Sequence, residues 1–198
     1  TDLRTGLAGA VAARHLAPAR VETVGVVGVG MQARYQIESL ALIRDFGRLL
    51  VYGRDDGRSD AYMDYMRNAL DIEVERVAEI GEVVGRSDVV VTTTPSTTAL
   101  IEATHLHPGL HITAVGSDLA GKQEIAADAL MAADIYVPDR LSQVTTMGEL
   151  QHVRGGLDSL KRHAELGELT AGRVVGRSDD AAITICDLTG TGAQDTAI

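Results

Sequence analysis

The apolar residues of this chain repeat with two periods in turn, one typical of helices and the other of buried strands. Residues 3–11 carry apolar side chains at helical spacing, which predicts a first helix that ends near Pro18. Residues 21–28, with the sequence VETVGVVG, are valine-rich and bounded by glycine, as expected of a buried parallel strand. Residues 33–41 return to the helical period, and residues 49–52 form a second apolar run closed by glycine. The order strand, helix, strand predicts one β-α-β unit.

The alternation continues along most of the chain. Further helices are expected at about 61–70 and 78–84, and further strands at about 72–77, 88–94, 111–116, 134–138 and 182–188. Strands that alternate with helices form a parallel sheet covered on both faces, so the predicted fold class is α/β, a doubly wound parallel sheet of the Rossmann type. Because such sheets bind ligands at the carboxyl ends of their strands, we expect the functional residues in the loops that follow the strands.

Composition narrows the class of protein and its partner. The 198 residues, of which 45% are hydrophobic and 23% charged, suit one globular domain. The net charge of -10 comes with no basic block, so we expect a small-molecule partner and neither nucleic acid nor an anionic membrane. Cys186 has no second cysteine to pair with, and no apolar stretch is long enough for a bilayer span or a signal peptide. The expected location is the cytoplasm.

A glycine-rich loop follows the first predicted strand. Residues 28–33, GVGMQA, have the G-x-G-x-x-A spacing of dinucleotide-binding loops. Gly28 would permit the tight turn, Gly30 would let the backbone approach a pyrophosphate, and Ala33 would let helix and strand pack closely. The alternative is a strand-to-helix turn that only needs small residues. Because strand, loop and helix occur in the required order, we predict a dinucleotide site.

The residues after the second strand bear on the choice between NAD and NADP. NAD enzymes usually carry Asp or Glu there to hold the ribose hydroxyls, whereas this chain has Gly53 followed by Arg54. A carboxylate would repel a 2′-phosphate, while an arginine can pair with it, so NADP(H) is favoured. NAD(H) remains an alternative because Asp55 and Asp56 follow directly, and Arg54 could also be a solvated surface side chain.

Two later loops carry polar residues at strand ends. Residues 92–96, TTTPS, could face a cofactor, although threonines also suit strands and proline ends them. After the strand at 111–116, Asp118 and Lys122 place a carboxylate and an ammonium close together in sequence. Asp118 could exchange a proton with a substrate or could cap a helix, and spacing leaves both readings open.

Two other features are not expected to be functional sites. His105, His107 and His111 are divided by a Pro-Gly turn and have no neighbouring carboxylate or cysteine, so no metal site is predicted. Cys186 lies in an apolar run without a basic partner, which predicts an inert buried thiol.

Successive short signatures identify a family. They are TDLRTG at 1–6, GVGMQA at 28–33, GSD with GK at 116–122, SQ with GEL at 142–150, and DLTGTGAQD at 187–195. In this order they resemble the motifs of the ornithine cyclodeaminase/mu-crystallin family over essentially the whole chain. The first and last are the most specific, because they are not general features of Rossmann folds. The later segments are closest to the ectoine-utilisation branch.

The resemblance implies a role for each matching residue. Arg4, Met31 and Gln32 would bind the cofactor phosphates, together with Gly28, Gly30 and Ala33, which shape the same loop. The other cofactor-binding residues would be Thr94 on the adenosine side, Ala114, Val115, Gly116 and Ser117 along the nicotinamide, and Thr189 and Gly190, up to Gly192, over its ring. Asp118 would be the catalytic acid/base, and Lys122 would support the same pocket. The resemblance thereby favours proton exchange over helix capping for Asp118.

The resemblance also implies a chemistry. Family members use a nicotinamide cofactor at the α C–N bond of an amino acid or cyclic imino acid, as imine reductases or as cyclodeaminases. A protein that binds a small ligand without catalysis, as mu-crystallin does, is the alternative. The presence of both Asp118 and Lys122 favours catalysis. The absence of an acid after the second strand speaks against ornithine cyclodeamination itself, and members with an arginine there tend towards NADPH and imine reduction.

The chain begins at Thr1 rather than Met and stops at Ile198 within an apparent helix. We therefore expect residues 1–198 to be the dinucleotide-binding domain, with flanking helices, of a longer enzyme. In the family an amino-terminal segment binds the substrate carboxylate and forms a dimer. We expect that segment to lie outside residues 1–198 and to form a homodimer.

Overall fold

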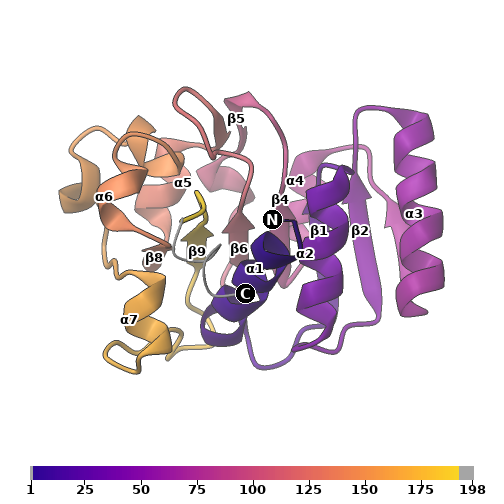
Figure 1. The fold of residues 1–198 in the computed structure, drawn as a ribbon, viewed down its shortest axis with the longest axis horizontal. Coiled ribbons are helices and arrows are strands. Elements are labelled where there is room, and N and C mark those ends of the chain that lie inside the picture. The colour runs from indigo at the N-terminus through magenta and orange to yellow at the C-terminus, as the bar shows by residue number, and fades with distance from the viewer. Residues whose placement is uncertain (1, 192–198) are drawn as a thin grey trace.

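Runs of buried apolar residues pair side by side in one parallel sheet, in a computed structural model that describes residues 2–191 (Figure 1). The strands are β1 Thr23–Val27, β2 Arg48–Tyr52, β3 Glu73–Arg76, β4 Val89–Thr92, β6 His111–Ala114, β8 Ile135–Pro138 and β9 Thr184–Asp187. They lie in the order β3-β2-β1-β4-β6-β9-β8, and every adjacent pair is parallel. The chain runs outward from β1 to β3 and then places β4 on the other side of β1. That reversal is the switch point at which doubly wound sheets bind ligands.

Helices cover both faces of the sheet (Figure 1). They are α1 Asp2–Leu16, α2 Met31–Ala41, α3 Asp56–Leu70, α4 Ile80–Gly85, α5 Ala127–Ala132, α6 Leu141–Val144 and α7 Leu166–Thr170, with the 3-10 helices η1 Ala103–His105, η2 Glu149–His152 and η3 Gly156–Ser159. On one face, α1, α2 and α3 pack on strand residues such as Val24 and Val26, and α7 packs with α1 near Cys186. On the other face, α4, α5 and η2 cover a core that includes Val90 and Ile112.

The predicted fold class is confirmed, and the departures from the predicted elements have local causes. α3 begins at Asp56, earlier than expected, because Asp55 caps it by accepting a hydrogen bond from Arg58 N at 2.8 Å. The sequence does not predict β5 (Thr97–Ile101) or β7 (Gln123–Ile125), which pair in a separate two-stranded sheet. Both are short and carry polar residues, so their sequences lack the apolar run of the main strands.

The three histidines and the cysteine for which no site was predicted lie on different elements. His105 ends η1, His107 lies in the following loop, and His111 begins β6, where burial lowers its pKa to about 3. Cys186 is fully buried in β9, and burial raises the pKa of its thiol. Among residues 2–191, no cluster of three or more His, Cys, Asp or Glu could hold a metal ion. No helix in the same range is both long and apolar enough to cross a membrane.

Candidate functional site

The glycine loop joins β1 to α2, and its small residues differ in their surroundings. Gly28 has a φ of 105°, a left-handed conformation, and a Cβ on it would lie 2.8 Å from Thr93 Oγ1. Gly30, by contrast, has no atom within 4 Å of the place its Cβ would occupy, so the backbone there is open. Ala33 is fully buried in the core beneath α2. These surroundings agree with the tight turn, the open approach and the close packing expected of a dinucleotide loop.

The amino end of α2 faces the same open space. The helix starts at Met31, and Gly30 at the N-cap offers no side chain to its free N–H groups. Met31 is 55% exposed, and Gln32 is partly exposed. A helix end of this kind carries positive potential and unsatisfied donors, which suit a phosphate group.

A cavity of about 680 Å³ opens beside the glycine loop, at the carboxyl ends of β1, β2 and β4. It is lined by Gly28, Val29, Gly30, Tyr52, Gly53, Arg54, Asp55, Arg58, Thr93, Thr94, Pro95, Ser96, Thr98 and Leu100. Thr93 Oγ1 is buried here and has no hydrogen-bond partner within the described part of the chain. Of the predicted site residues, Gly28, Gly30, Arg54 and Thr94 lie in the wall of this cavity, and the others lie outside it.

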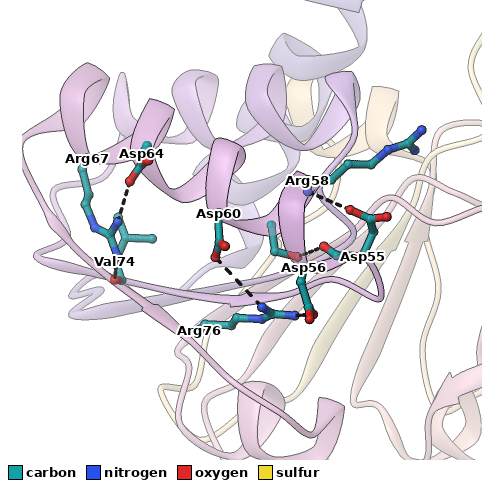
Figure 2. A network of polar contacts seen from close by, with 9 residues as sticks. Asp55, Asp56, Arg58, Asp60, Asp64, Arg67, Val74 and Arg76 are labelled. Carbon is teal, nitrogen blue, oxygen red and sulfur yellow. Dashed lines mark hydrogen bonds and ion pairs between the residues drawn. The ribbon is translucent and has the colours of Figure 1, made fainter.

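Two arginines border the cavity near the start of α3. Arg54 lies in the bend between β2 and α3, and Arg58 lies in the first turn of α3. Arg58 is a candidate site residue that was not predicted from the sequence, where its only signal is its place four residues after Arg54. In Figure 2 the Arg58 guanidinium extends away from Asp56, which pairs with Arg76. Asp55 lies in the cavity wall, where it caps α3.

Gly53 packs closely against side chains of α3 and of the glycine loop. A Cβ at this position would overlap Ser59 Oγ of α3 and would lie 2.9 Å from Val29 Cγ2 in the glycine loop. A side chain at position 53 would require the side chains of Ser59 and Val29 to move. The charged residues of this part of the cavity wall are Arg54, Arg58 and Asp55.

Asp118 and Lys122 form an ion pair in the loop after β6. Lys122 Nζ lies 2.6 Å from Asp118 Oδ1, and the two side chains are 24% and 51% exposed. No helix begins at Asp118, so the helix-cap reading is wrong. Ser117 closes the loop, because its buried hydroxyl donates a hydrogen bond to Lys122 O at 2.8 Å. A half-exposed carboxylate held by an ammonium can exchange a proton with a bound ligand.

Residues 114–116, at the end of β6, have mainly backbone groups available to the candidate site. The side chains of Ala114 and Val115 are buried in the core. Gly116 lies against the loop after β4, because a Cβ on it would overlap Thr94 O. Any lining of a nicotinamide by these residues would therefore come from their backbone groups.

The segment after β9 lies beside the start of α1. Arg4 Nη1 donates a hydrogen bond to Thr191 O at 3.0 Å, which brings the first and last sequence signatures together. Thr189 Oγ1 and Gly190 N donate to the Asp139 carboxylate at 2.9 and 2.7 Å. Asp139 was missed in the sequence, where its only signal is its place at a strand end. Gly192, also expected over the nicotinamide ring, lies outside the described residues.

Known proteins share this fold and sequence. An uncharacterized cyclodeaminase of Sinorhizobium fredii is 40% identical over 202 residues, which cover 100% of this chain and 60% of that protein. An archaeal alanine dehydrogenase dimer with bound NAD has a TM-score of 0.91 and 35% identity, over 99% of this chain and 61% of that one. The iminosuccinate reductase of Paracoccus denitrificans, in complex with NAD+, has a TM-score of 0.88 and 32% identity, over 100% of this chain and 60% of that one.

The chain spans about 60% of the length of the curated relatives it matches. The family model of the ornithine cyclodeaminase/mu-crystallin family matches residues 1–198. Because this match extends over every signature that the sequence analysis singled out, the chain belongs to the ornithine cyclodeaminase/mu-crystallin family.

Proposed function

We propose that this chain is the dinucleotide-binding part of a two-domain enzyme that acts at the α C–N bond of an amino acid or imino acid. The observation that carries the proposal is the cavity at the switch point, bordered by the open Gly30 and the uncapped end of α2. Relatives named as an alanine dehydrogenase and an iminosuccinate reductase, both solved with NAD, support it. The substrate-binding segment, and the homodimer formed through it, would lie outside this chain.

The cofactor would be a nicotinamide dinucleotide, which supplies or accepts hydride when bound. The backbone N–H groups at Gly30 and the start of α2 would hold its pyrophosphate, and the cavity beside Thr94 would hold its adenosine.

Asp118 would manage the proton at the substrate nitrogen. An imine must gain a proton there when it is reduced, and an amine must lose one when it is oxidised, so a carboxylate can serve a reductase or a cyclodeaminase. Lys122, 2.6 Å away, would orient that carboxylate. A protein that only binds its ligand has no need of this exposed pair.

The adenosine end would favour NADP(H). Arg54 and Arg58 both border the cavity, and position 53 itself carries no carboxylate that would repel a 2′-phosphate, while Asp55 in the same wall caps α3. The solved relatives named above contain NAD, so this preference is attributed to the two arginines of this chain and is tested separately from cofactor binding.

Titration of the chain with NADPH and NADH tests the first step. We expect binding without turnover by this chain. We also expect turnover by the full-length protein with at least one of pyrroline-carboxylate, piperideine-carboxylate, ornithine or alanine. If the chain bound neither cofactor, the proposal would be overturned. Binding by a full-length protein that converts none of these compounds would favour the ligand-binding alternative.

A further inference from the structure

Three buried carboxylates lie beneath the candidate site. Glu124 of β7, Glu149 at the start of η2 and Asp187 at the end of β9 are each at most 1% exposed. Burial raises the pKa of all three, to about 9 for Glu149 and about 7 for Asp187. Burying an acid is costly unless hydrogen bonds compensate for the lost water. The partners of these acids therefore show what their burial stabilises.

The Glu124 carboxylate joins the loops after β4 and β6. Oε1 accepts a hydrogen bond from Thr94 N at 2.5 Å. Oε2 accepts one from Gly116 N at 2.8 Å and one from Thr92 Oγ1 at 2.6 Å. One side chain thus binds backbone N–H groups from two loops that face the candidate site, at the ends of adjacent strands.

The hydrogen bonds of Glu124 to the two loops require a residue without a side chain at position 116. A Cβ on Gly116 would overlap Thr94 O and would lie 2.5 Å from Glu124 Cδ. The two loops can therefore approach each other only because position 116 has no side chain. The carboxylate occupies the remaining space and sets their separation.

Glu149 and Asp187 support the position of Glu124. Glu149 accepts hydrogen bonds from Glu124 N and Ile125 N, each at 3.0 Å. Glu149 N donates to Asp187 Oδ2 at 2.7 Å, and Tyr136 OH donates to the same oxygen at 2.5 Å. The chain of acids runs from the end of β9 to the loops after β4 and β6.

The helix η2 also holds the loop that carries Asp118. Gln151 Oε1 accepts a hydrogen bond from Gly121 N at 2.8 Å, and His152 Nε2 lies 2.8 Å from Lys122 O. The carboxyl group of Glu149 and the side chains that follow it in η2 are therefore part of one support for the Gly116–Lys122 loop.

We propose that Glu124 is a positioning residue: its carboxylate holds the Thr94 segment and the Gly116–Lys122 loop at the separation that the cofactor requires. The inference rests on the proposed function only in that these loops face the cofactor. A glutamine at this position keeps the volume but turns an N–H group toward donors, so at least one of the contacts from Thr94 N, Gly116 N and Thr92 Oγ1 is lost.

The test compares Glu124→Gln with wild type in three measurements: hydrogen exchange at the Thr94 and Gly116 amides, cofactor affinity and melting temperature. Without cofactor, we expect at least one of the two amides to exchange faster in the variant. With whichever of NADPH or NADH the wild type binds, we expect affinity to fall about tenfold or more. Thr184→Val is the control, because it breaks the buried bonds of Thr184 Oγ1 to Leu16 O and His111 Nδ1 at the opposite end of the strands.

If Glu124 only stabilised the fold, Glu124→Gln and Thr184→Val would both lower the melting temperature, and the two variants would have the same cofactor affinity. Unchanged affinity in Glu124→Gln, or equal losses in Thr184→Val, would overturn the inference. If the wild type binds no cofactor, the proposed function fails, while the exchange data still decide whether Glu124 holds the two loops. If Glu124→Gln does not fold, Thr92→Val removes one donor to the same carboxylate and should produce a smaller change of the same kind.

Discussion

Lys122 Nζ lies 2.6 Å from Asp118 Oδ1 in a turn that follows β6 and begins no helix. Spacing alone left Asp118 as either a helix cap or a proton carrier, and the capping role is excluded by this geometry. The carboxylate is 51% exposed, so it can meet a ligand without opening the core.

Replacing Asp118 with Asn in the full-length protein should reduce turnover by about a hundred- to ten-thousand-fold, the usual contribution of a general acid or base. Cofactor affinity and melting temperature should hardly change, because an exposed ion pair contributes little to stability. Steady-state rates, titration and thermal unfolding measure the three quantities. Asp64→Asn, in an exposed ion pair with Arg67, is the control and should leave turnover normal. Normal turnover in Asp118→Asn would remove Asp118 from the mechanism.

Arg54→Ala and Arg58→Ala should each weaken NADPH binding by about tenfold and leave NADH binding nearly unchanged, because only NADPH carries the 2′-phosphate that a guanidinium can pair with. Titration with both cofactors measures the ratio of their affinities. Arg67→Ala, at the far end of α3 and bonded to Val74 O, is the control that removes a charge away from the cavity. Wild-type protein that binds NADH as tightly as NADPH would contradict the proposed preference.

Gly28→Ala and Gly30→Ala should separate folding from binding within one loop. At Gly28, with a φ of 105° and Thr93 Oγ1 in the way, alanine should lower the free energy of unfolding by about 1–3 kcal/mol. At Gly30, an N-cap in an extended conformation with open space around it, alanine should cost no more than about 1 kcal/mol. Cofactor affinity should nevertheless fall in Gly30→Ala, since the methyl group occupies the approach of the pyrophosphate. Urea unfolding and titration give both values, and unaltered affinity in Gly30→Ala would place the pyrophosphate elsewhere.

Glu149→Gln should change how stability depends on pH. The pKa of Glu149 is raised from 4.5 to about 9 by burial, so between these values the unfolded chain binds fewer protons at this group than the folded chain does. The free energy of unfolding therefore falls as pH rises through this window, by up to about 1.4 kcal/mol per pH unit.

The cleanest interval for that measurement is pH 7 to 9, above the value of about 7 to which burial raises the pKa of Asp187. Urea unfolding across it should show a smaller loss of stability in Glu149→Gln than in wild type. Glu22→Gln, which alters an exposed carboxylate, should keep the wild-type slope. The same slope in all three proteins would mean that Glu149 is ionised throughout.

The parallel sheet, the glycine loop and the family could be predicted from the sequence, because each depends on residues that are neighbours along the chain. The period at which apolar residues repeat predicts each strand and helix from its own segment of the sequence. The small residues within 28–33 likewise predict the conformation of the glycine loop. The helix cap formed by Asp55 also involves neighbours in the sequence. Because Asp is a common N-cap residue, its hydrogen bond from Arg58 N could have been predicted.

Contacts between residues that are far apart in the sequence could not be predicted and are seen only in the folded chain. Glu124 binds Thr92 and Thr94 because β4 and β6 are paired side by side and β7 returns beside β5, and no spacing in the sequence specifies that contact. Asp187 likewise meets Glu149 through the placement of β9 beside β6. The physical reason is that a hydrogen bond depends on distance in space, which the packing of the sheet and its helices sets, whereas the apolar pattern specifies only which face of each element is buried.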